Sequence, residues 1–398
     1  MSLRTEGQSV TVAGAGPAGL VAAITLARAG TDVVVCDRQS DAGLRFNGDF
    51  QGLENWSTRE DVCEWLRGLG IDVDFTAAPF RSGTFYSPGG KEYRAQTTKP
   101  IFYLVRRGSQ PDTVDQALKR QALAAGVRFE WGTEVKSFKG RTVIAATGPK
   151  TADVIAKGIV FETHHPDVCL GFLDDTIAPK GYSYLLVHDG HATLASCMYE
   201  DFRNERTYFE RTLERVRAVV ELDIVAPREF GGYGNFFFSD TLEATSEEGR
   251  VLYAGESAGF QDALWGFGMR YAMESGYCAA QSILTGASYS RLCRERFHPR
   301  MLATLADRWM FSWLGNRGYE WWMRRLFDGR DVIDSLHRLY QPSLARAMVA
   351  PLARRAWKTR LLDKRCSHDD CTCVWCRHGS HEGSASCGSE PTQISTHA

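Results

Sequence analysis

The pattern of apolar and polar positions predicts a strand, a helix and a second strand within the first 40 residues. Val10–Ala13 is a short apolar run, which is typical of a buried parallel strand. Helix-forming residues with few breaks occupy positions 18–29, and positions 31–36 again suit a buried strand. Strand, helix and strand in this order predict a βαβ unit and therefore a parallel sheet.

Further along the chain, the same reasoning predicts more elements of both kinds. Helices are expected at residues 114–125 and 269–284. Strands are expected at residues 129–135, within 142–149 and within 250–260. The interleaving of strands and helices favours an α/β fold.

The middle of the chain has a different period. Residues 182–187 and 192–198 alternate between apolar and polar or small side chains, as half-buried strands do. The dipeptide Asp189-Gly190 between them is a strong signal for a two-residue hairpin turn. We therefore expect paired antiparallel strands in a β-rich region at 151–244.

The turn after the first strand carries the residues that a dinucleotide site needs. Gly14 allows the tight turn, Gly16 lets the backbone approach a pyrophosphate, and Gly19 lets the helix pack closely on the strand. Pro17 suits the first helical position, where its missing N–H costs nothing. Asp37 ends the second strand, near the spacing expected for an acid that binds a ribose. Strand, turn, helix and acid together predict a bound dinucleotide.

Composition changes this picture little. The chain has 398 residues and a formal net charge of -1, which gives no basic face for nucleic acid. No signal-peptide pattern or long apolar run is evident, so a cytoplasmic location is expected. Eleven cysteines are too dispersed for a secreted disulfide framework. Six of them are expected to be small buried hydrophobes: Cys36, Cys63, Cys169, Cys197, Cys278 and Cys293.

Two later segments bear on which dinucleotide is bound. The run at 142–149 ends in Thr-Gly-Pro, and the run at 250–260 leads into Gly255 and Glu256. Trp265-Gly-Phe-Gly268 and a helical stretch follow. With these motifs the chain resembles the p-hydroxybenzoate hydroxylase-like class of FAD enzymes, and more narrowly the geranylgeranyl reductase family, over roughly residues 8–290. The resemblance implies a Rossmann-type FAD-binding domain, a mixed-sheet substrate domain and a helical C-terminal region.

The resemblance also implies roles for particular residues. Gly255 and Glu256 stand where the family has a Gly-Asp pair that binds the ribityl and pyrophosphate part of FAD, while Gly266 and Gly268 match backbone beside the flavin ring. Of two adjacent arginines before the helix at 114–125, we favour Arg106 at the cofactor, and an exposed basic pair is an alternative interpretation. The expected FAD-binding set is Gly14, Gly16, Pro17, Ala18, Gly19, Asp37, Arg38, Arg106, Gly255, Glu256, Gly266 and Gly268.

The strand at 182–187 is the candidate substrate wall. Residues 179–187 are similar to the geranylgeranyl reductase signature, with tyrosine in place of tryptophan at 184, leucine in place of phenylalanine at 186 and valine in place of the closing proline. Tyr182, Tyr184 and Leu186 share one face of the strand and could line an apolar cavity. The alternative is that this face is ordinary core.

The expected division of the chain is discontinuous. Residues 1–150 and 245–290 form the FAD-binding domain, 151–244 the substrate domain and 291–362 a helical region. The Trp- and Arg-rich helices of this region suit either a cover over the core or peripheral contact with a membrane. Residues 363–398 hold a Cys/His-rich motif and an end expected to be disordered.

That motif is a candidate metal site. The proposed zinc ligands are Cys366, Cys371, Cys373 and Cys376, with a histidine able to replace one of them. An iron–sulfur cluster and a redox-sensitive tail without metal are the alternatives.

The resemblance to geranylgeranyl reductases implies an FAD-dependent reductase of carbon–carbon double bonds in an isoprenoid or similar apolar small molecule or lipid. NADPH or a reduced carrier is the expected electron donor, and the oligomeric state is undetermined. Tyr182 is a candidate proton donor, although a core hydrogen bond explains its phenol equally well. The alternative functions are a flavin-dependent monooxygenase or halogenase, and a scaffold protein without activity.

Overall fold

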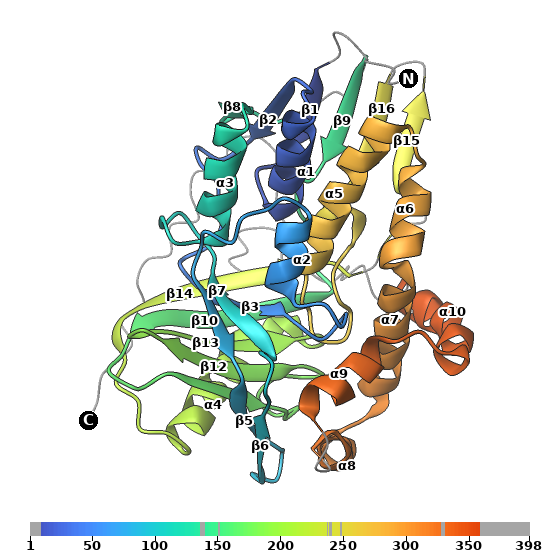
Figure 1. Cartoon of the computed structure of the whole chain (residues 1–398). Helices are drawn as coiled ribbons and strands as arrows, with labels where there is room; N and C mark the ends of the chain where they lie inside the picture. The colour runs from blue at the N-terminus through green and yellow to red at the C-terminus, as the bar shows by residue number, and fades with distance from the viewer. Residues whose placement is uncertain are drawn as a thin grey trace.

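The computed structural model describes residues 9–135, 140–149, 152–236, 238, 241–246, 249–327 and 331–358. Three sheets, the helices that pack against them and a set of C-terminal helices make up this part of the chain (Figure 1). The predicted α/β class is confirmed, with a Rossmann-type domain, a mixed sheet and C-terminal helices. No described helix is both long enough and apolar enough to cross a membrane.

The first sheet holds the predicted βαβ unit. Its six strands have the order β15-β16-β9-β1-β2-β8, and all neighbours are parallel except β15 and β16. The strands are β1 (Val10–Ala13), β2 (Val33–Asp37), β8 (Arg128–Trp131), β9 (Arg141–Ala145), β15 (Glu243–Ser246) and β16 (Gly249–Tyr253). The expected strand at 129–135 ends early, because Gly132 takes a left-handed conformation after Trp131.

Three helices lie along one face of this sheet (Figure 1). They are α1 (Pro17–Arg28), α3 (Val114–Ala124) and α5 (Met269–Thr285), and α1 contacts both of the others. Pro17 is the first residue of α1, as predicted, and the Thr113 hydroxyl caps α3 by accepting from the Gln116 N–H. A side chain at Gly276 of α5 would overlap the carbonyl oxygen of Ala18, so this helix crossing requires glycine.

The second sheet has seven strands in the order β14-β10-β13-β12-β11-β5-β6. They are β5 (Ser82–Tyr86), β6 (Glu92–Gln96), β10 (Val154–Glu162), β11 (Val168–Phe172), β12 (Tyr182–His188), β13 (His191–Met198) and β14 (Val225–Gly234). The predicted hairpin is confirmed, since β12 pairs with β13 through left-handed Asp189 and Gly190. Helix α4 (Glu205–Arg217) follows a short 3-10 turn, η1 (Phe202–Asn204), and packs against β13 and β10. Strands β5 and β6 come from the first 150 residues, so this sheet draws on more than the region at 151–244.

The third sheet joins the other two parts. It has the order β3-β7-β4 and is antiparallel, with β3 (Phe50–Glu54), β4 (Ala77–Phe80) and β7 (Phe102–Arg106). Helix α2 (Val62–Gly68) begins after Asp61, whose carboxylate accepts from the N–H groups of Cys63 and Glu64. Phe50 and Phe102 are both buried in a cluster that also contains Leu186 of β12.

The predicted C-terminal helices extend from the side of α5 to the level of the seven-stranded sheet (Figure 1). They are α6 (Tyr289–Arg296), α7 (His298–Trp313), α8 (Asn316–Leu326), α9 (Val332–Tyr340) and α10 (Leu344–Lys358). Among the six cysteines expected in the core, five are buried and Cys197 is half-buried. The proposed metal ligands Cys366, Cys371, Cys373 and Cys376 lie outside the described residues.

Candidate functional site

One large cavity connects the turn after β1 to the face of β12. Its volume is about 1530 Å3. At one end it is lined by the glycine turn and Asp37, and at the other by aromatic and aliphatic side chains of the seven-stranded sheet, α8 and α9. Ten of the twelve residues predicted for the cofactor, all except Gly19 and Arg106, therefore share one space with the three predicted for the substrate.

The three glycines of the turn meet different surroundings. A Cβ at Gly14, whose φ is +111°, would overlap the carbonyl oxygen of Ala146, and a Cβ at Gly19 would overlap the carbonyl oxygen of Gly14. A Cβ at Gly16 would meet no protein atom within 4 Å, and Gly16 lines the cavity. Gly14 and Gly19 are therefore needed for packing, whereas Gly16 leaves open backbone beside the cavity. This arrangement fits a pyrophosphate at the start of α1.

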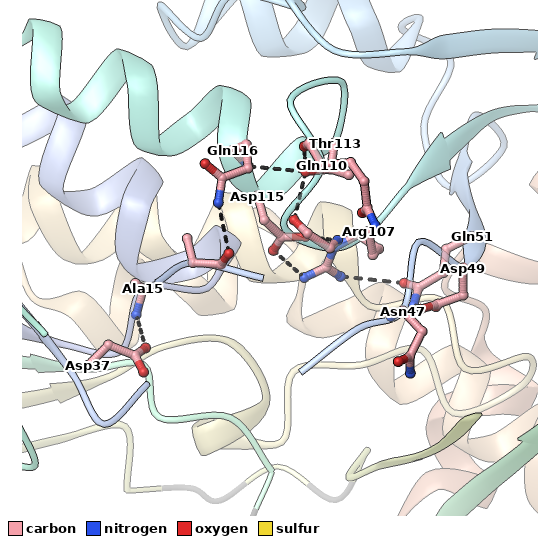
Figure 2. Close-up of polar contacts among 12 residues, drawn as sticks. Ala15, Asp37, Asn47, Asp49, Gln51, Arg107, Gln110, Thr113, Asp115 and Gln116 are labelled. Atoms are coloured by element: carbon pink, nitrogen blue, oxygen red, sulfur yellow. Dashed lines mark hydrogen bonds and ion pairs between the residues drawn. The ribbon is translucent and has the colours of Figure 1, made fainter. Parts of the chain in front are cut away.

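Asp37 lies at the end of β2 and is held by the same turn. Its Oδ2 accepts from the Ala15 N–H at 2.7 Å (Figure 2). Its Oδ1 accepts from the Gln39 N–H at 2.8 Å. Both Asp37 and Arg38 line the cavity. The carboxylate is thus fixed at the strand end, where an acid that binds a ribose is expected.

Of the two adjacent arginines, the structure brings Arg107 into the cavity wall. Arg107 is 6 % exposed, and its Nε and Nη2 each donate to the carboxylate of Asp115 at 2.8 Å (Figure 2). The guanidinium lies 4.1 Å from the centre of the Phe46 ring. Burial lowers the pKa of Arg107, but the carboxylates of Asp115, Asp49 and Glu256 outweigh burial, so the net pKa is raised.

Arg106 points elsewhere. Its Nη1 forms an ion pair with Asp112 at 3.1 Å, and Arg106 is not among the residues that line the cavity. The role of Arg106 at a cofactor stays a prediction, and the geometry favours Arg107. Sequence reasoning missed Asp115, although an acid in the first turn of an otherwise apolar helix face was an available signal.

The loop before α5 is built around a buried carboxylate. Asp262 accepts from the N–H groups of Leu264 at 3.0 Å and Trp265 at 2.8 Å, and from the hydroxyl of Tyr340 in α9 at 2.9 Å. Burial raises the pKa of Asp262 to about 6, although these three donors oppose the increase. Asp262 carried no sequence motif that would have identified it.

Three consecutive backbone carbonyls of this loop accept hydrogen bonds from side chains outside it. Arg308 of α7 donates to the carbonyl of Leu264 at 3.2 Å, and Tyr182 of β12 donates to that of Trp265 at 2.6 Å. Gln261 donates to the carbonyl of Gly266 at 2.8 Å. We call residues 262–268 the anchored loop. Because its carbonyls are occupied, the loop presents a fixed backbone to the cavity.

The anchored loop leads directly into the start of α5. Gly266, Gly268 and Met269 line the cavity, and no side chain caps the helix at Gly268. The first N–H groups of a helix have no partner within the helix and carry partial positive charge. Together with Gly255 and Glu256, which also line the cavity, they could hold the electron-rich end of a flavin.

The predicted substrate residues form part of the opposite wall. Tyr182, Tyr184 and Leu186 all line the cavity, with Trp322 and Leu326 of α8 also contributing. Burial raises the pKa of Tyr182 and Tyr184 well above their ordinary value, so both phenols stay neutral near pH 7. The two hydroxyls differ, because that of Tyr182 is donated to the loop whereas that of Tyr184 makes no hydrogen bond with the described residues.

A metal site is not part of this geometry. Among the residues that the structure describes, no group of three or more His, Cys, Asp and Glu side chains could hold a metal ion.

Comparison with known proteins agrees with this geometry. Residues 8–147 match the family described as FAD binding domain. The digeranylgeranylglycerophospholipid reductase of Methanocaldococcus jannaschii is 23 % identical over 312 residues, which are 68 % of this chain and 75 % of the relative. Reductase 1 of the same name from Methanothermobacter thermautotrophicus is 24 % identical over 339 residues, which are 72 % of this chain and 82 % of the relative.

Solved structures show the same fold. A geranylgeranyl bacteriochlorophyll reductase-like protein from Thermoplasma acidophilum superposes with a TM-score of 0.63 and 18 % identity, covering 88 % of this chain and 99 % of the other. A flavin-dependent brominase superposes with a TM-score of 0.60 and 14 % identity, covering 88 % and 98 %. At these identities the likeness establishes the fold alone.

Proposed function

Since the chain is an FAD-dependent oxidoreductase related to the geranylgeranyl reductases, we propose that it reduces carbon–carbon double bonds of an isoprenoid chain or a similar apolar lipid. The observation that carries the proposal is the shared cavity. It joins a glycine turn that fits a dinucleotide to an apolar wall formed by Tyr184, Leu186 and Leu326. Both archaeal relatives carry the name of a lipid reductase.

The chain's own residues divide between binding and positioning. Asp37 would bind the ribose, and the open backbone at Gly16 would let the pyrophosphate lie against the start of α1. Arg107 is fixed by Asp115 beside the same cavity, and the anchored loop would place its N–H groups at the flavin ring. When bound, FAD supplies hydride transfer, and the protein contributes orientation, electrostatics and a site shielded from water.

Proton delivery is assigned to Tyr184 in this proposal. Its hydroxyl lies in the cavity wall and makes no hydrogen bond with the described residues, so none of them competes with a substrate carbon for its proton. The proton of Tyr182 is committed to the carbonyl of Trp265, which makes Tyr182 a positioning residue for the anchored loop.

The test is an anaerobic single-turnover experiment. The protein is purified with FAD, reduced chemically and mixed with a polyprenyl lipid, and the product is analysed by mass spectrometry. A mass increase of two hydrogens per reoxidised flavin supports the proposal. If reoxidation instead requires oxygen and an aromatic substrate, which becomes hydroxylated or halogenated, the protein is a monooxygenase or halogenase. Failure to bind FAD would indicate the scaffold alternative.

Three finer parts of the proposal need their own measurements. NADPH as electron donor predicts that NADPH reduces the bound flavin in stopped-flow absorbance, and a reduced carrier is the alternative. Zinc at Cys366, Cys371, Cys373 and Cys376 predicts about one zinc per chain by elemental analysis, lost when these cysteines become serine. Peripheral contact with a membrane predicts that the protein sediments together with lipid vesicles.

A further inference from the structure

Helix α8 has two faces with different surroundings. Trp322, Met323 and Leu326 line the cavity, so this face forms part of its wall. On the other face Trp321 is 54 % exposed, which is unusual for so large an apolar side chain. Figure 1 shows α8 at the end of the molecule opposite the six-stranded sheet. The helix therefore separates the apolar cavity from the exterior.

The outward face of α8 combines tryptophan with positive charge. Arg317, Trp321, Arg324 and Arg325 are exposed and recur at the spacing of one helical face. The Arg325 guanidinium lies 5.5 Å from the Trp321 ring centre. Trp313, at the end of the preceding helix α7, is 74 % exposed. We call these five residues the docking face.

The one acidic residue of α8 stays ionised near Arg324, but its carboxylate is half-buried against a neighbouring turn instead of exposed with the arginines. Glu320 accepts hydrogen bonds from the Ser87 hydroxyl and from the Gly89 N–H in the turn between β5 and β6. These contacts, with the Ser87 bond contributing most, lower the pKa of Glu320 and tie its carboxylate to that turn. The docking face thus presents three arginines and two tryptophans.

We propose that the docking face binds the surface of an anionic lipid bilayer and places the cavity beside it, so that a lipid chain enters next to α8. The proposal rests on the proposed function, because it assumes a lipid substrate. Tryptophan prefers the interfacial region of a membrane, and arginine is attracted to anionic headgroups. Each basic residue near such a surface strengthens binding by about five-fold, so three give roughly a hundred-fold preference for anionic vesicles.

The experiment measures co-sedimentation of the FAD-loaded full chain with vesicles of phosphatidylglycerol and phosphatidylcholine, against vesicles of phosphatidylcholine alone. The double variant R324E/R325E is expected to bind the anionic vesicles at least about twenty-fold more weakly, and W321A several-fold more weakly. The matched control is R206E/R217E, which makes the same charge change on exposed positions of α4 and is expected to bind as wild type.

Several outcomes overturn the proposal. One is equal binding of wild type to both kinds of vesicle, and another is equal loss in the α4 control. A third is loss of vesicle binding in M348E but not in R324E/R325E. That result would assign the membrane contact to α10, whose Leu344, Met348 and Leu352 are also exposed at helical spacing. Salt-resistant capture of wild type by a protein, without any vesicle binding, would make the docking face a protein interface.

A second readout separates this proposal from the proposed function. Reduction of a short prenyl substrate dispersed in detergent is measured for wild type and for R324E/R325E. Equal activity in detergent with lost activity on vesicles supports the docking face. No reduction in detergent by wild type would reject the proposed function while the vesicle binding result still stands. Activity of R324E/R325E on vesicles equal to wild type would overturn docking alone.

Discussion

Replacing Gly16 by alanine separates cofactor binding from folding. Gly16 has φ −84° and ψ 176°, which alanine adopts without strain, and the added Cβ would meet no protein atom within 4 Å. Alanine is a poorer N-cap residue than glycine but loses less entropy on folding. These effects oppose each other, so the free energy of unfolding of the apoprotein should change by less than about 1 kcal/mol.

Cofactor affinity should change much more. The added methyl group would occupy the space where a pyrophosphate must approach the backbone, and it would weaken at least one hydrogen bond to a charged group. Such a bond contributes about 1.5–3 kcal/mol, which corresponds to roughly ten- to hundred-fold weaker FAD binding. The dissociation constant is measured by quenching of flavin fluorescence on titration with apoprotein, and stability is measured by urea unfolding of the same sample.

Gly30 provides the matched control. It follows α1 and has φ +84°, and a Cβ added there would also meet no protein atom within 4 Å, but Gly30 does not line the cavity. Alanine in this left-handed conformation should cost about 1 kcal/mol of stability and leave FAD affinity unchanged. Wild-type FAD affinity in Gly16→Ala, or weakened affinity in Gly30→Ala, would refute the placement of the pyrophosphate at the turn.

Three further predictions concern the rest of the site. Arg107→Met leaves a buried carboxylate unpaired and should lower the free energy of unfolding by about 3–5 kcal/mol. Arg106→Met breaks a more exposed ion pair and should lower it by less than about 1 kcal/mol. Urea unfolding measures both, and a larger loss for Arg106→Met than for Arg107→Met would contradict this prediction. Tyr184→Phe should slow double-bond reduction about a hundred-fold and leave the flavin spectrum unchanged. Tyr182→Phe should weaken FAD binding by roughly ten-fold and leave the pH profile of the reduction rate unchanged. The reverse pattern would exchange the roles of the two tyrosines. Asp262 holds its proton more tightly in the folded protein, so its contribution to the free energy of unfolding should fall by up to about 3 kcal/mol as pH rises from 4 to 6. Asp262→Asn should reduce the slope of the free energy of unfolding against pH in this range. Identical slopes for wild type and variant would contradict the raised pKa.

Local signals made the first part of the fold predictable. The turn after β1 and the hairpin at Asp189 and Gly190 depend on residues that are close in sequence and have restricted backbone conformations. The face of β12 followed from simple alternation, which placed Tyr182, Tyr184 and Leu186 on one side. Sequence alone left open whether that side was core or cavity, because both are apolar.

Distant contacts explain what was missed. Arg106 and Arg107 are chemically alike, and the choice between them depends on Asp115, which lies on another element. The anchored loop is held by Arg308 and Tyr340, which come from helices far along the chain and carry no local motif. Side chains whose role is set by a tertiary partner leave no pattern in one sequence.

The sharing of strands between distant segments has a consequence for synthesis of the protein. Strands β5 and β6 belong to the same sheet as β11, which is translated roughly 70 residues later, and β9 is made about 100 residues before its partner β16. At about 5–20 residues per second, both sheets keep unpaired edges for several seconds on the ribosome. Such edges favour pairing with other chains, so high-level expression should benefit from chaperones that bind the unpaired strands. The seven-stranded sheet is complete only in a fragment that reaches residue 234, and the six-stranded sheet only in one that reaches residue 253.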